Sequence, residues 1–413
     1  MKTYKVIVDT DPGVDDANAV FYLLNDPQFD VKLFTISNGN INIHNATRNM
    51  CHILDLLHKD IPVVEGISKR FGDNTEDATF LHGVEGLGQY TPPKKTTHQP
   101  LNMDCADATY EILKENPKQI TMIILGPHTN FAHLILKHPD APKLIKNIVM
   151  MGGAPNGTKM DPNHNSFNIR TDVPAFQYTL TTKLPVVMCP STIGRDIGYF
   201  DERQVETLKN TNDIGKFFAK TFEKYWEPNY PEKIIATNDL CAIYYLTHPK
   251  LYKTYRCFMD VDEKGKTLPK KSWRGNFKVV TNLNRKKFMK MIFEKLNEMS
   301  NIKLDLNFEI PENITSEKPK KKIAKETKSK SQKQAKEPKP SSKKVSQKPT
   351  KVTKAKVEKS EKETKSASKT TSKEVKSKTK NSAKNTSKKS TKSNADVSQK
   401  PTKTTSKKSA KND

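Results

Sequence analysis

The C-terminal end of this 413-residue sequence lacks the side chains that build a hydrophobic core. Phe308 is the last aromatic residue, and neither Leu nor Met follows it. From about residue 315 onward the chain is almost entirely Lys, Ser, Thr, Ala, Glu, Gln, Asn and Pro. Such a segment cannot bury enough apolar surface to offset the entropy lost on folding. We therefore predict a globular domain over residues 1–313 and a disordered Lys/Ser/Thr-rich basic tail over residues 314–413.

The globular part lacks an excess of charge of either sign. Residues 316–413 hold 33 Lys against 9 Asp and Glu, whereas residues 1–315 hold 39 basic and 37 acidic groups. The formal net charge of +26 therefore belongs almost entirely to the tail. Because the tail has no aromatic side chains among its lysines, we expect it to contact nucleic acid or other polyanions non-specifically, by charge and without base stacking. The alternatives are contact with anionic lipid and a solubilising role without a partner.

Paired cysteines and long apolar runs are also missing. The five cysteines are widely spaced, and none lies in a CxxC motif or at metal-ligand spacing from a histidine. We therefore expect neither a disulfide framework nor a zinc site, and buried reduced thiols are typical of a cytoplasmic protein. No run approaches the roughly 18 apolar residues of a membrane helix, and no apolar signal core precedes the first predicted strand. We expect a soluble cytoplasmic protein.

The first half of the chain contains an alternation of strand-like and helix-like segments. The predicted strands are residues 4–8, 31–37, 61–65, 120–125, 145–151 and 185–188. The predicted helices are residues 15–24, 45–57, 105–115, 130–136 and 173–180. This alternation predicts an α/β fold with an open, mainly parallel, Rossmann-like sheet that has helices on both faces. Residues 200–313 look mostly helical at first and then mixed.

Acids and amides follow several of the predicted strands. Asp9 and Asp11 end the first strand, Asn40 follows the second, and Thr129 and Asn130 follow the fourth. In an open parallel sheet, ligands bind beyond the carboxyl ends of the strands. These side chains therefore predict a binding site at one edge of the sheet.

The strongest chemical signal is the run from Asp9 to Asp16, DTDPGVDD, which has four carboxylates. Carboxylates this close repel one another unless a cation or hydrogen-bond donors neutralise them. The Pro-Gly turn after the strand can fold Asp11 and Asp16 towards one point. Hard oxygen ligands without nearby His or Cys favour Ca²⁺ or Mg²⁺ over zinc. A helix N-terminus that simply favours acids would explain Asp15 and Asp16, but not the two acids at the strand end.

A strand that ends in Asp-x-Asp also opens the haloacid-dehalogenase phosphatases, in which the first Asp is a phosphorylated nucleophile. Those enzymes usually place Thr or Val two residues after the second Asp, where this chain has Gly13. They also lack an adjacent acidic pair such as Asp15 and Asp16. The phosphatase interpretation therefore fits the run less well than a metal site does.

The segment DTDPGVDDA resembles the signature of the inosine/uridine-preferring nucleoside hydrolases. The resemblance extends from residue 1 to about residue 310, through further motifs in the same order. These motifs are Asn40, the segment from His82 to Gly88, Thr129-Asn130, Met151-Gly152-Gly153, Phe167-Asn168 and Asp239. The resemblance implies the nucleoside hydrolase fold, a homodimer or homotetramer, and calcium-dependent hydrolysis of the N-glycosidic bond of ribonucleosides to free base and ribose, for nucleoside salvage.

The resemblance also implies roles for individual residues at the metal. Asp11, Asp16 and Asp239 would bind one Ca²⁺ through carboxylates, and Thr129 through its backbone carbonyl. The ribose hydroxyls and a water would complete the coordination, which the flexible shell of calcium permits. Asp11 would activate the metal-bound water as general base, and Asp9 would support the run from below.

Further residues are assigned to the substrate by the same resemblance. Asp15 and Asn40 would bind the ribose hydroxyls, Asn168 the 5′ end, and Met151 would lie against the ring. Either Asn163 or Asn165 is a candidate replacement for a ribose-binding Asn. The leaving of the base builds positive charge on the ribose, so the transition state resembles an oxocarbenium ion.

Two positions depart from the family pattern. Ser166 stands where the family commonly has Glu, and Asn238 where it usually has a His that serves or supports the leaving-group acid. An amide donates a hydrogen bond but no proton at neutral pH, so His82 and His164 become candidate donors. A preference for a different 5′ end or a different base is a further alternative. The alternative function is a catalytically weak ribose- or nucleoside-binding protein that retains the calcium pocket.

Overall fold

The computed structural model describes residues 2–223, 225, 232–304 and 306. The predicted tail, residues 314–413, and its boundary with the domain lie outside these ranges. Within them, all five cysteines are buried and carry free thiols. None of the described helices is both long and apolar enough to cross a membrane.

Eleven strands are described, nine of which form one sheet in the order β10-β9-β11-β6-β5-β4-β1-β2-β3. They are β1 Tyr4–Thr10, β2 Phe29–Ile36, β3 Val63–Glu65, β4 Thr121–Ile124, β5 Asn147–Met151, β6 Val186–Cys189, β7 Tyr199–Asp201, β8 Ile234–Ala236, β9 Tyr252–Val261, β10 Thr267–Lys271 and β11 Phe277–Leu283. Strands β1 to β6 and β11 pair in parallel, whereas β9 pairs antiparallel with β10 and β11. Strands β7 and β8 form a separate antiparallel pair.

Thirteen α-helices and one 3₁₀ turn connect these strands within the described ranges. They are α1 Val14–Leu24, α2 Ile43–Leu57, α3 Thr79–His82, α4 Cys105–Glu115, α5 Thr129–Lys137, α6 Ala141–Leu144, α7 Phe167–Arg170, α8 Val173–Thr181, α9 Ser191–Asp196, α10 Glu202–Lys209, α11 Asp213–Phe222, α12 Asn238–Thr247, η1 Pro249–Leu251 and α13 Arg285–Glu298.

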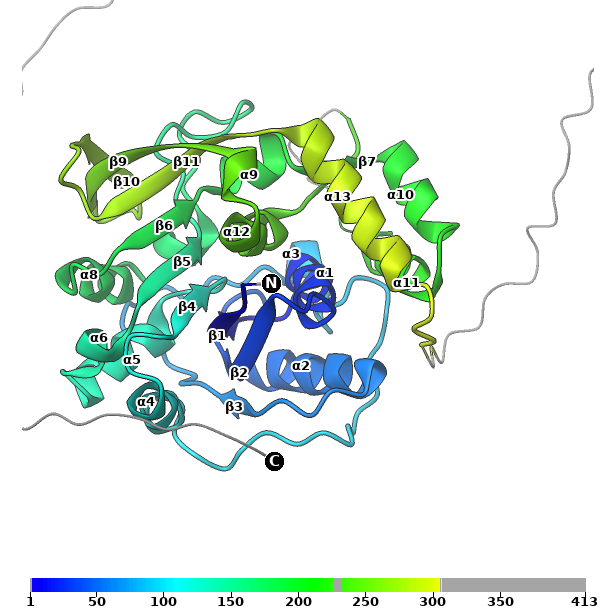
Figure 1. The fold of residues 1–413 in the computed structure, drawn as a ribbon, viewed down its shortest axis with the longest axis horizontal. Helices are drawn as coiled ribbons and strands as arrows, with labels where there is room; N and C mark the ends of the chain where they lie inside the picture. The colour runs from blue at the N-terminus through cyan, green and yellow to red at the C-terminus, as the bar shows by residue number, and fades with distance from the viewer. Residues whose placement is uncertain (1, 224, 226–231, 305, 307–413) are drawn as a thin grey trace, which may run out of the picture. The chain divides into compact units, whose positions relative to one another are not determined.

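The alternation of side chains along β1 shows why the sheet is covered on both faces. Val6 and Val8 pack into one buried cluster with side chains of α1, α2, α11, α12 and α13. Ile7, which points to the opposite face, packs into a second cluster with side chains of α4, α5 and α8. Successive side chains of a strand point to opposite faces, so an all-apolar strand needs cover on both. Figure 1 shows the two helical layers on either side of the sheet.

The predicted fold class is confirmed: the sheet is open and mainly parallel, with helices on both faces. Each predicted strand and helix of the first half overlaps an observed one, and α4 has the predicted bounds. The short helices α3, α6, α7 and α9 were not anticipated, because one turn of helix carries too little periodicity to recognise. The mixed character predicted after residue 200 corresponds to α10 to α12 followed by the β9–β11 edge.

The strand order reverses at β1, because β2 pairs with one side of β1 and β4 with the other. Such a reversal opens a crevice at the carboxyl ends of the two strands, where loops leave in opposite directions. The run from Asp9 to Asp16 leaves β1 at this point, and Thr129 begins α5 shortly after β4.

Candidate active site

The loop after β1 folds the acidic run back on itself. Asp16 lies in the first turn of α1, and its Oδ2 accepts the N–H of Gly13 at 3.2 Å. Its Oδ1 accepts the Thr10 hydroxyl at 2.6 Å. Acidic side chains are favoured at a helix N-terminus, because they satisfy N–H groups that have no partner within the helix. The same bonds hold the Asp16 carboxylate above the end of β1.

Asp11 and Asn40 join the ends of β1 and β2. The Asp11 Oδ2 accepts the backbone N–H of Asn40 at 2.8 Å. The Asn40 side-chain amide donates to Asp16 Oδ2 at 2.9 Å and to the Asp11 carbonyl at 3.2 Å. Asp11 Oδ1 is buried and has no hydrogen-bond partner among the described residues. One oxygen of Asp11 is therefore held in place, and the other is available to a ligand.

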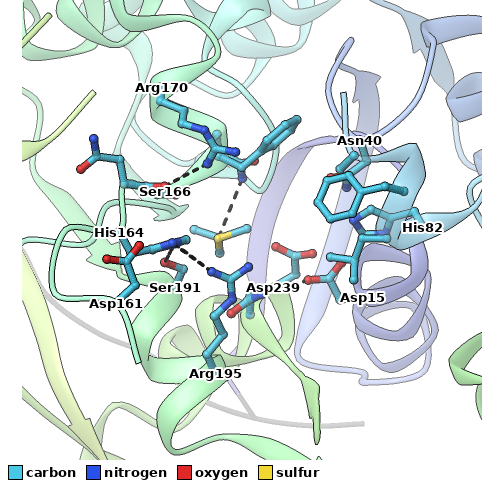
Figure 2. Close-up of a pocket in the computed structure, with 18 of the residues that line it drawn as sticks. Asp15, Asn40, His82, Asp161, His164, Ser166, Arg170, Ser191, Arg195 and Asp239 are labelled. Atoms are coloured by element: carbon cyan, nitrogen blue, oxygen red, sulfur yellow. Dashed lines mark hydrogen bonds between the residues drawn. The ribbon is translucent and has the colours of Figure 1, made fainter. Parts of the chain in front are cut away.

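A third segment brings Asp239 to the same place from the far end of the domain. Asp239 lies in the first turn of α12, and one carboxylate oxygen from each of Asp15, Asp16 and Asp239 lies within 4.8 Å of the others. The neighbouring Asn238 amide donates to Asp15 Oδ2 at 3.2 Å. Asp239 Oδ1 is buried without a described partner. Figure 2 shows Asp239 and Asp15 facing the same space.

The electrostatics of this acidic cluster, defined as Asp11, Asp15, Asp16 and Asp239, favour a bound cation. Burial, and after it the charge of Asp16, raises the pKa of Asp11 well above its ordinary value. The pKa of Asp239 is raised well above its ordinary value by the same two causes, and that of Asp16 is raised by burial and by Asp15. Only oxygen ligands are offered, two of them without partners, so the residues suit a hard divalent cation. Asp15, Asp16 and Asp239 are therefore placed to hold a metal ion, whereas Asp11 is not one of the three carboxylates that lie within 4.8 Å of one another.

Asp9 lies beneath the cluster and is already satisfied by hydrogen bonds. Its carboxylate accepts the Thr35 hydroxyl at 2.5 Å, the Ser37 hydroxyl, and the Asn130 amide at 2.8 Å. Burial raises its pKa to about 6 in spite of these bonds. Because its partners come from β2, the residue just beyond it and α5, Asp9 ties together the elements that carry the other acids.

Thr129 is buried at the first residue of α5. Its hydroxyl donates to Asp172 Oδ2 at 2.6 Å, and Asp172 also accepts the N–H groups of Phe71 and Gly72. The hydroxyl of Thr129 is therefore already used in a hydrogen bond to Asp172. The group of Thr129 that the sequence resemblance assigns to the metal is its backbone carbonyl.

A pocket of about 400 Å³ opens over the acidic cluster. It is lined by nine of the predicted site residues: Asp15, Asn40, His82, Met151, Asn163, Ser166, Asn168, Asn238 and Asp239. The other three, Asp11, Asp16 and Thr129, are buried and do not line it. Residues from separate strand ends and loops thus surround one cavity (Figure 2).

The predicted 5′ end of the site is built around Asn168 in the short helix α7. Its amide donates to the Leu125 carbonyl and lies 3.9 Å from the Met151 sulfur. Ser166, the N-cap residue of α7, makes no capping hydrogen bond with its side chain. The carbonyl bond fixes Asn168 beside Met151, so the two can contact the same ring of a substrate.

His82 is buried in the pocket wall and is neutral at neutral pH. Its Nδ1 accepts the backbone N–H of Val14 at 3.0 Å, which places the ring proton on Nε2. Burial lowers its pKa to about 4. The ring lies beside that of Tyr225, with the centroids 5.0 Å apart. In this state His82 can donate a hydrogen bond but has no acidic proton to transfer.

His164 occupies the opposite wall and is neutral as well. Its Nε2 lies 2.8 Å from Arg195 Nη1 and 3.4 Å from the Ser191 hydroxyl. Burial, followed by the charges of Arg195 and Arg170, lowers the pKa of His164 to about 4. Neither candidate histidine is therefore protonated at neutral pH.

Sequence reasoning missed several residues of the pocket lining. Arg195, Ser191, Tyr225, Phe80 and Arg170 all line it, but none had been assigned a role. Arg170 could have been suspected, since it follows Asn168 by two residues in the same motif. No pattern in the sequence indicated a role for Arg195 or Ser191. Their helix, α9, is too short to be recognised from periodicity, and only tertiary packing brings it beside the loop that carries His164.

We expect Gly39→Ala to impair the site without unfolding the protein. A Cβ at position 39 would lie 2.0 Å from Asp11 Oδ2 and 2.8 Å from Pro127 Cδ, so the Asp11 carboxylate must move. A misplacement of about 1 Å in a reacting group can cost about 100-fold, and we expect kcat/KM to fall by about tenfold to 100-fold. Gly72→Ala is the matched control, because its Cβ meets nothing closer than 3.3 Å. Equal kcat/KM values for the two variants, measured in the same assay, would contradict the placement of Asp11.

Comparison with known proteins gives a consistent result. The family model described as inosine-uridine preferring nucleoside hydrolase matches residues 6–290. The non-specific ribonucleoside hydrolase RihC of Salmonella newport is 31% identical over 260 residues, which is 63% of this chain and 84% of that protein. A plant nucleoside hydrolase, PpNRh1, has a TM-score of 0.66 at 28% identity, covering 71% of this chain and 99% of that structure. A purine-preferring ribonucleoside hydrolase from Gardnerella vaginalis shares the fold, with a TM-score of 0.66 at 24% identity over 72% of this chain and its own full length.

Proposed function

This chain belongs to the inosine-uridine preferring nucleoside hydrolase family and is an N-glycosyl hydrolase, and from that premise we propose that it uses one Ca²⁺ to hydrolyse ribonucleosides to free base and ribose. The observation that carries the proposal is the acidic cluster at the bottom of the pocket. It brings carboxylates from two ends of the domain together, beside the amides of Asn40 and Asn168.

The ligands proposed for Ca²⁺ are the carboxylates of Asp11, Asp16 and Asp239 and the backbone carbonyl of Thr129. Calcium is preferred over magnesium because its shell of six to eight oxygens leaves room for a ribose diol and a water, whereas Mg²⁺ loses its own waters reluctantly. The bound cation supplies positive charge that acidifies the attacking water and orients the diol.

Side chains of the protein accept the proton of the attacking water and hold the ribose in position. The unpartnered Oδ1 of Asp11 is the acceptor for the water proton, and the bond from Asn40 holds the other oxygen in place. Asp15 and Asn40 hold the ribose hydroxyls, Asn163, Ser166 and Asn168 the 5′ side, and Met151 packs under the ring. Negative charge near the ribose stabilises the oxocarbenium-like transition state.

The leaving base is assisted by hydrogen bonds in this proposal. Asn238 and the Nε2–H of neutral His82 both line the pocket and can donate to an acceptor atom of the base. Neither supplies a strong acid, so bases that leave readily as anions, or that take a proton from solvent, are favoured. If this assistance proves too weak, the alternative is a ribose- or nucleoside-binding protein with slow catalysis.

The deciding experiment is an assay of the full-length protein with Ca²⁺ and a panel of inosine, guanosine, adenosine, uridine and cytidine. We expect reducing sugar to be released from at least one nucleoside. No release from any of them, with ribose binding retained in calorimetry, would reject the hydrolase proposal and leave the binding protein.

Three further proposals concern the cellular role of the protein, its oligomeric state and its C-terminal tail. We infer a role in nucleoside salvage in the cytoplasm and assembly as a homodimer or homotetramer. We also propose that residues 314–413 form a separate basic tail that contacts nucleic acid or other polyanions. The tail proposal rests on the 33 Lys against 9 acids after residue 315.

Binding of the tail to DNA is expected to depend steeply on salt. Each phosphate neutralised by Lys releases a counterion, so the logarithm of the binding constant should fall linearly with that of the salt concentration. Fluorescence anisotropy with a random-sequence duplex would measure this for the full chain and for residues 1–313. Equal binding by the two proteins at every salt concentration would reject a role for the tail.

A further inference from the structure

Arg70, in the loop after β3, is a buried cation whose hydrogen bonds go to backbone carbonyls. Its side chain is only 8% exposed and does not line the pocket. Within the described part of the chain, Nε donates to Asn38 at 3.1 Å, Nη2 to Gly39 at 3.4 Å, and Nη1 to Asn74 at 3.0 Å and to Glu76 at 2.7 Å. Burying a charge is costly, so a guanidinium that is bonded only to neutral carbonyls requires an explanation.

The charge of Arg70 acts on the acidic cluster. Burial lowers the pKa of Arg70, and the charge of Asp11 opposes this effect more than those of Asp172 and Glu76 do. An arginine stays protonated in a protein, so this positive charge is permanent. It reaches Asp11 through a peptide group and not through a direct ion pair.

That peptide group joins Gly39 and Asn40. Its carbonyl accepts the hydrogen bond from Arg70 Nη2, and its N–H donates to Asp11 Oδ2 at 2.8 Å. Resonance couples the oxygen of a peptide to its N–H, and hydrogen bonds in series strengthen one another by about 10–30% per bond. A cation at the carbonyl therefore makes the N–H a better donor to the Asp11 carboxylate.

The turn that carries this peptide packs closely against Asp11. A Cβ on Gly39 would lie 2.0 Å from Asp11 Oδ2, and a Cβ on Gly126 would lie 2.7 Å from Oδ1. The side-chain amide of Asn40 also donates to Asp16 Oδ2 at 2.9 Å. A small movement of the turn therefore changes the direction of the Asp11 carboxylate.

Arg70 is itself held from two sides. Besides the turn at Asn38 and Gly39, it holds the carbonyls of Asn74 and Glu76. The Glu76 carboxylate in turn pairs with Arg170 at 2.5 Å. Bonds to two loops keep the planar fork of the guanidinium in one orientation, which a more flexible lysine would not reproduce.

We propose that Arg70 is a positioning residue for the hydrolysis: it holds the Gly39–Asn40 peptide so that Oδ2 of Asp11 stays fixed and Oδ1 faces the attacking water. Arg70 does not touch the substrate, and its effect passes through Asp11. The inference rests on the proposed function, to which it adds the device that orients the general base.

The variant Arg70→Met, which is uncharged and cannot donate, tests this role in the full-length protein with Ca²⁺. The substrate is the nucleoside of the panel that the wild type hydrolyses fastest. We expect kcat to fall by about tenfold to 100-fold, since a misplacement of about 1 Å in a reacting group can cost about 100-fold. The KM should change by less than about threefold, because the lost interaction acts on the chemical step. Arg70→Lys keeps the charge and should have a kcat between those of Arg70→Met and the wild type.

Arg285→Met is the matched control. Arg285 is also partly buried and also donates to a backbone carbonyl, that of Tyr199 at 2.8 Å, but this bond lies at β7 and away from the acidic cluster. The control should keep the wild-type kcat, and thermal melts show that each variant is folded. Equal losses of kcat in the two variants would overturn the inference, because any buried arginine would then have the same effect.

A double-mutant cycle with Asp11→Asn shows whether Arg70 acts through Asp11. Residues that act as a unit are non-additive, so Arg70→Met should change kcat by less than about threefold once Asp11 is asparagine. An excess of enzyme over nucleoside keeps the slow turnover measurable. If Arg70→Met does not fold, the same cycle is made with Arg70→Lys.

The outcomes separate this inference from the proposed function. The same fold-loss of kcat in both backgrounds overturns the inference and leaves the proposed function standing, as does a change confined to the KM. No release of sugar by the wild type from any nucleoside of the panel rejects the proposed function itself.

Discussion

Replacing Asp11 by asparagine is expected to lower kcat by about 100-fold to 10,000-fold, the range over which a positioned general base contributes to catalysis. Asparagine keeps the shape of the side chain and can still accept the N–H of Asn40, so the loop after β1 should keep its conformation. It cannot take a proton from water, and it weakens a proposed metal ligand. Ribose release under saturating nucleoside measures the change.

A stability measurement separates the loss of chemistry from a loss of folding. Burial, and after it the charge of Asp16, raises the pKa of Asp11, so the neutral amide should leave the melting temperature of the metal-free protein unchanged or raise it. Asp60→Asn, at an exposed position, is the matched control and should change neither quantity. A variant Asp11→Asn that is folded and nearly as active as the wild type would show that Asp11 is not the base.

Removing divalent cations with a chelator is expected to abolish activity and to lower the melting temperature. The acidic cluster then has no counter-charge, and two of its carboxylate oxygens have no described partner. A cation at 100 times its dissociation constant stabilises the folded state by about 2.7 kcal/mol, which for a domain of about 300 residues corresponds to a shift of about 4 °C. Ca²⁺ should restore both activity and melting temperature, and Mg²⁺ should restore less of each.

The stability of the metal-free protein, and its stabilisation by Ca²⁺, should change with pH in opposite directions. Burial and neighbouring acids raise the folded-state pKa of Asp11 and Asp239 above the ordinary value of 3.8, so the folded metal-free protein holds more protons than the unfolded chain. Its stability should therefore fall as the pH rises from about 4 through the raised pKa values. The stabilisation by Ca²⁺ should grow over the same interval. Asp239→Asn should reduce this Ca²⁺-dependent stabilisation. Calorimetric scans at several pH values measure the shift in melting temperature on adding Ca²⁺. A shift as large in the variant as in the wild type would contradict the prediction.

The sequence indicated that Asp11, Asp16 and Asn40 lie close together, because the relevant geometry is local. Asp11 and Asp16 are separated by one turn, and a Pro-Gly turn after a buried strand leaves few ways to connect it to a helix. Asn40 was placed beside them by a general property of parallel sheets, in which the carboxyl ends of neighbouring strands share an edge. The hydrogen bonds between Asn40 and both acids follow from that shared edge.

The opposite end of the site could not be derived in this way. Asp239 was assigned by resemblance alone, since nothing in the local sequence indicates that α12 packs against α1. The protonation of His82 and His164 also depends on the fold: Nδ1 of His82 meets the Val14 N–H, and His164 meets Arg195. Burial and the nearest charge set these pKa values, and neither can be read from a single sequence.

By itself the sequence determined the class of fold, the position of the acidic run at a strand end, and the oxygen-only chemistry that suits a hard cation. These features depend on residue type, apolar periodicity and turns a few residues long. Only the tertiary structure decided that Asp239 completes the acidic cluster, that both histidines are neutral, and that Arg195 and Ser191 line the pocket. Those facts depend on contacts between segments far apart in the chain, which arise from the packing of α9 and α12 against the rest of the domain.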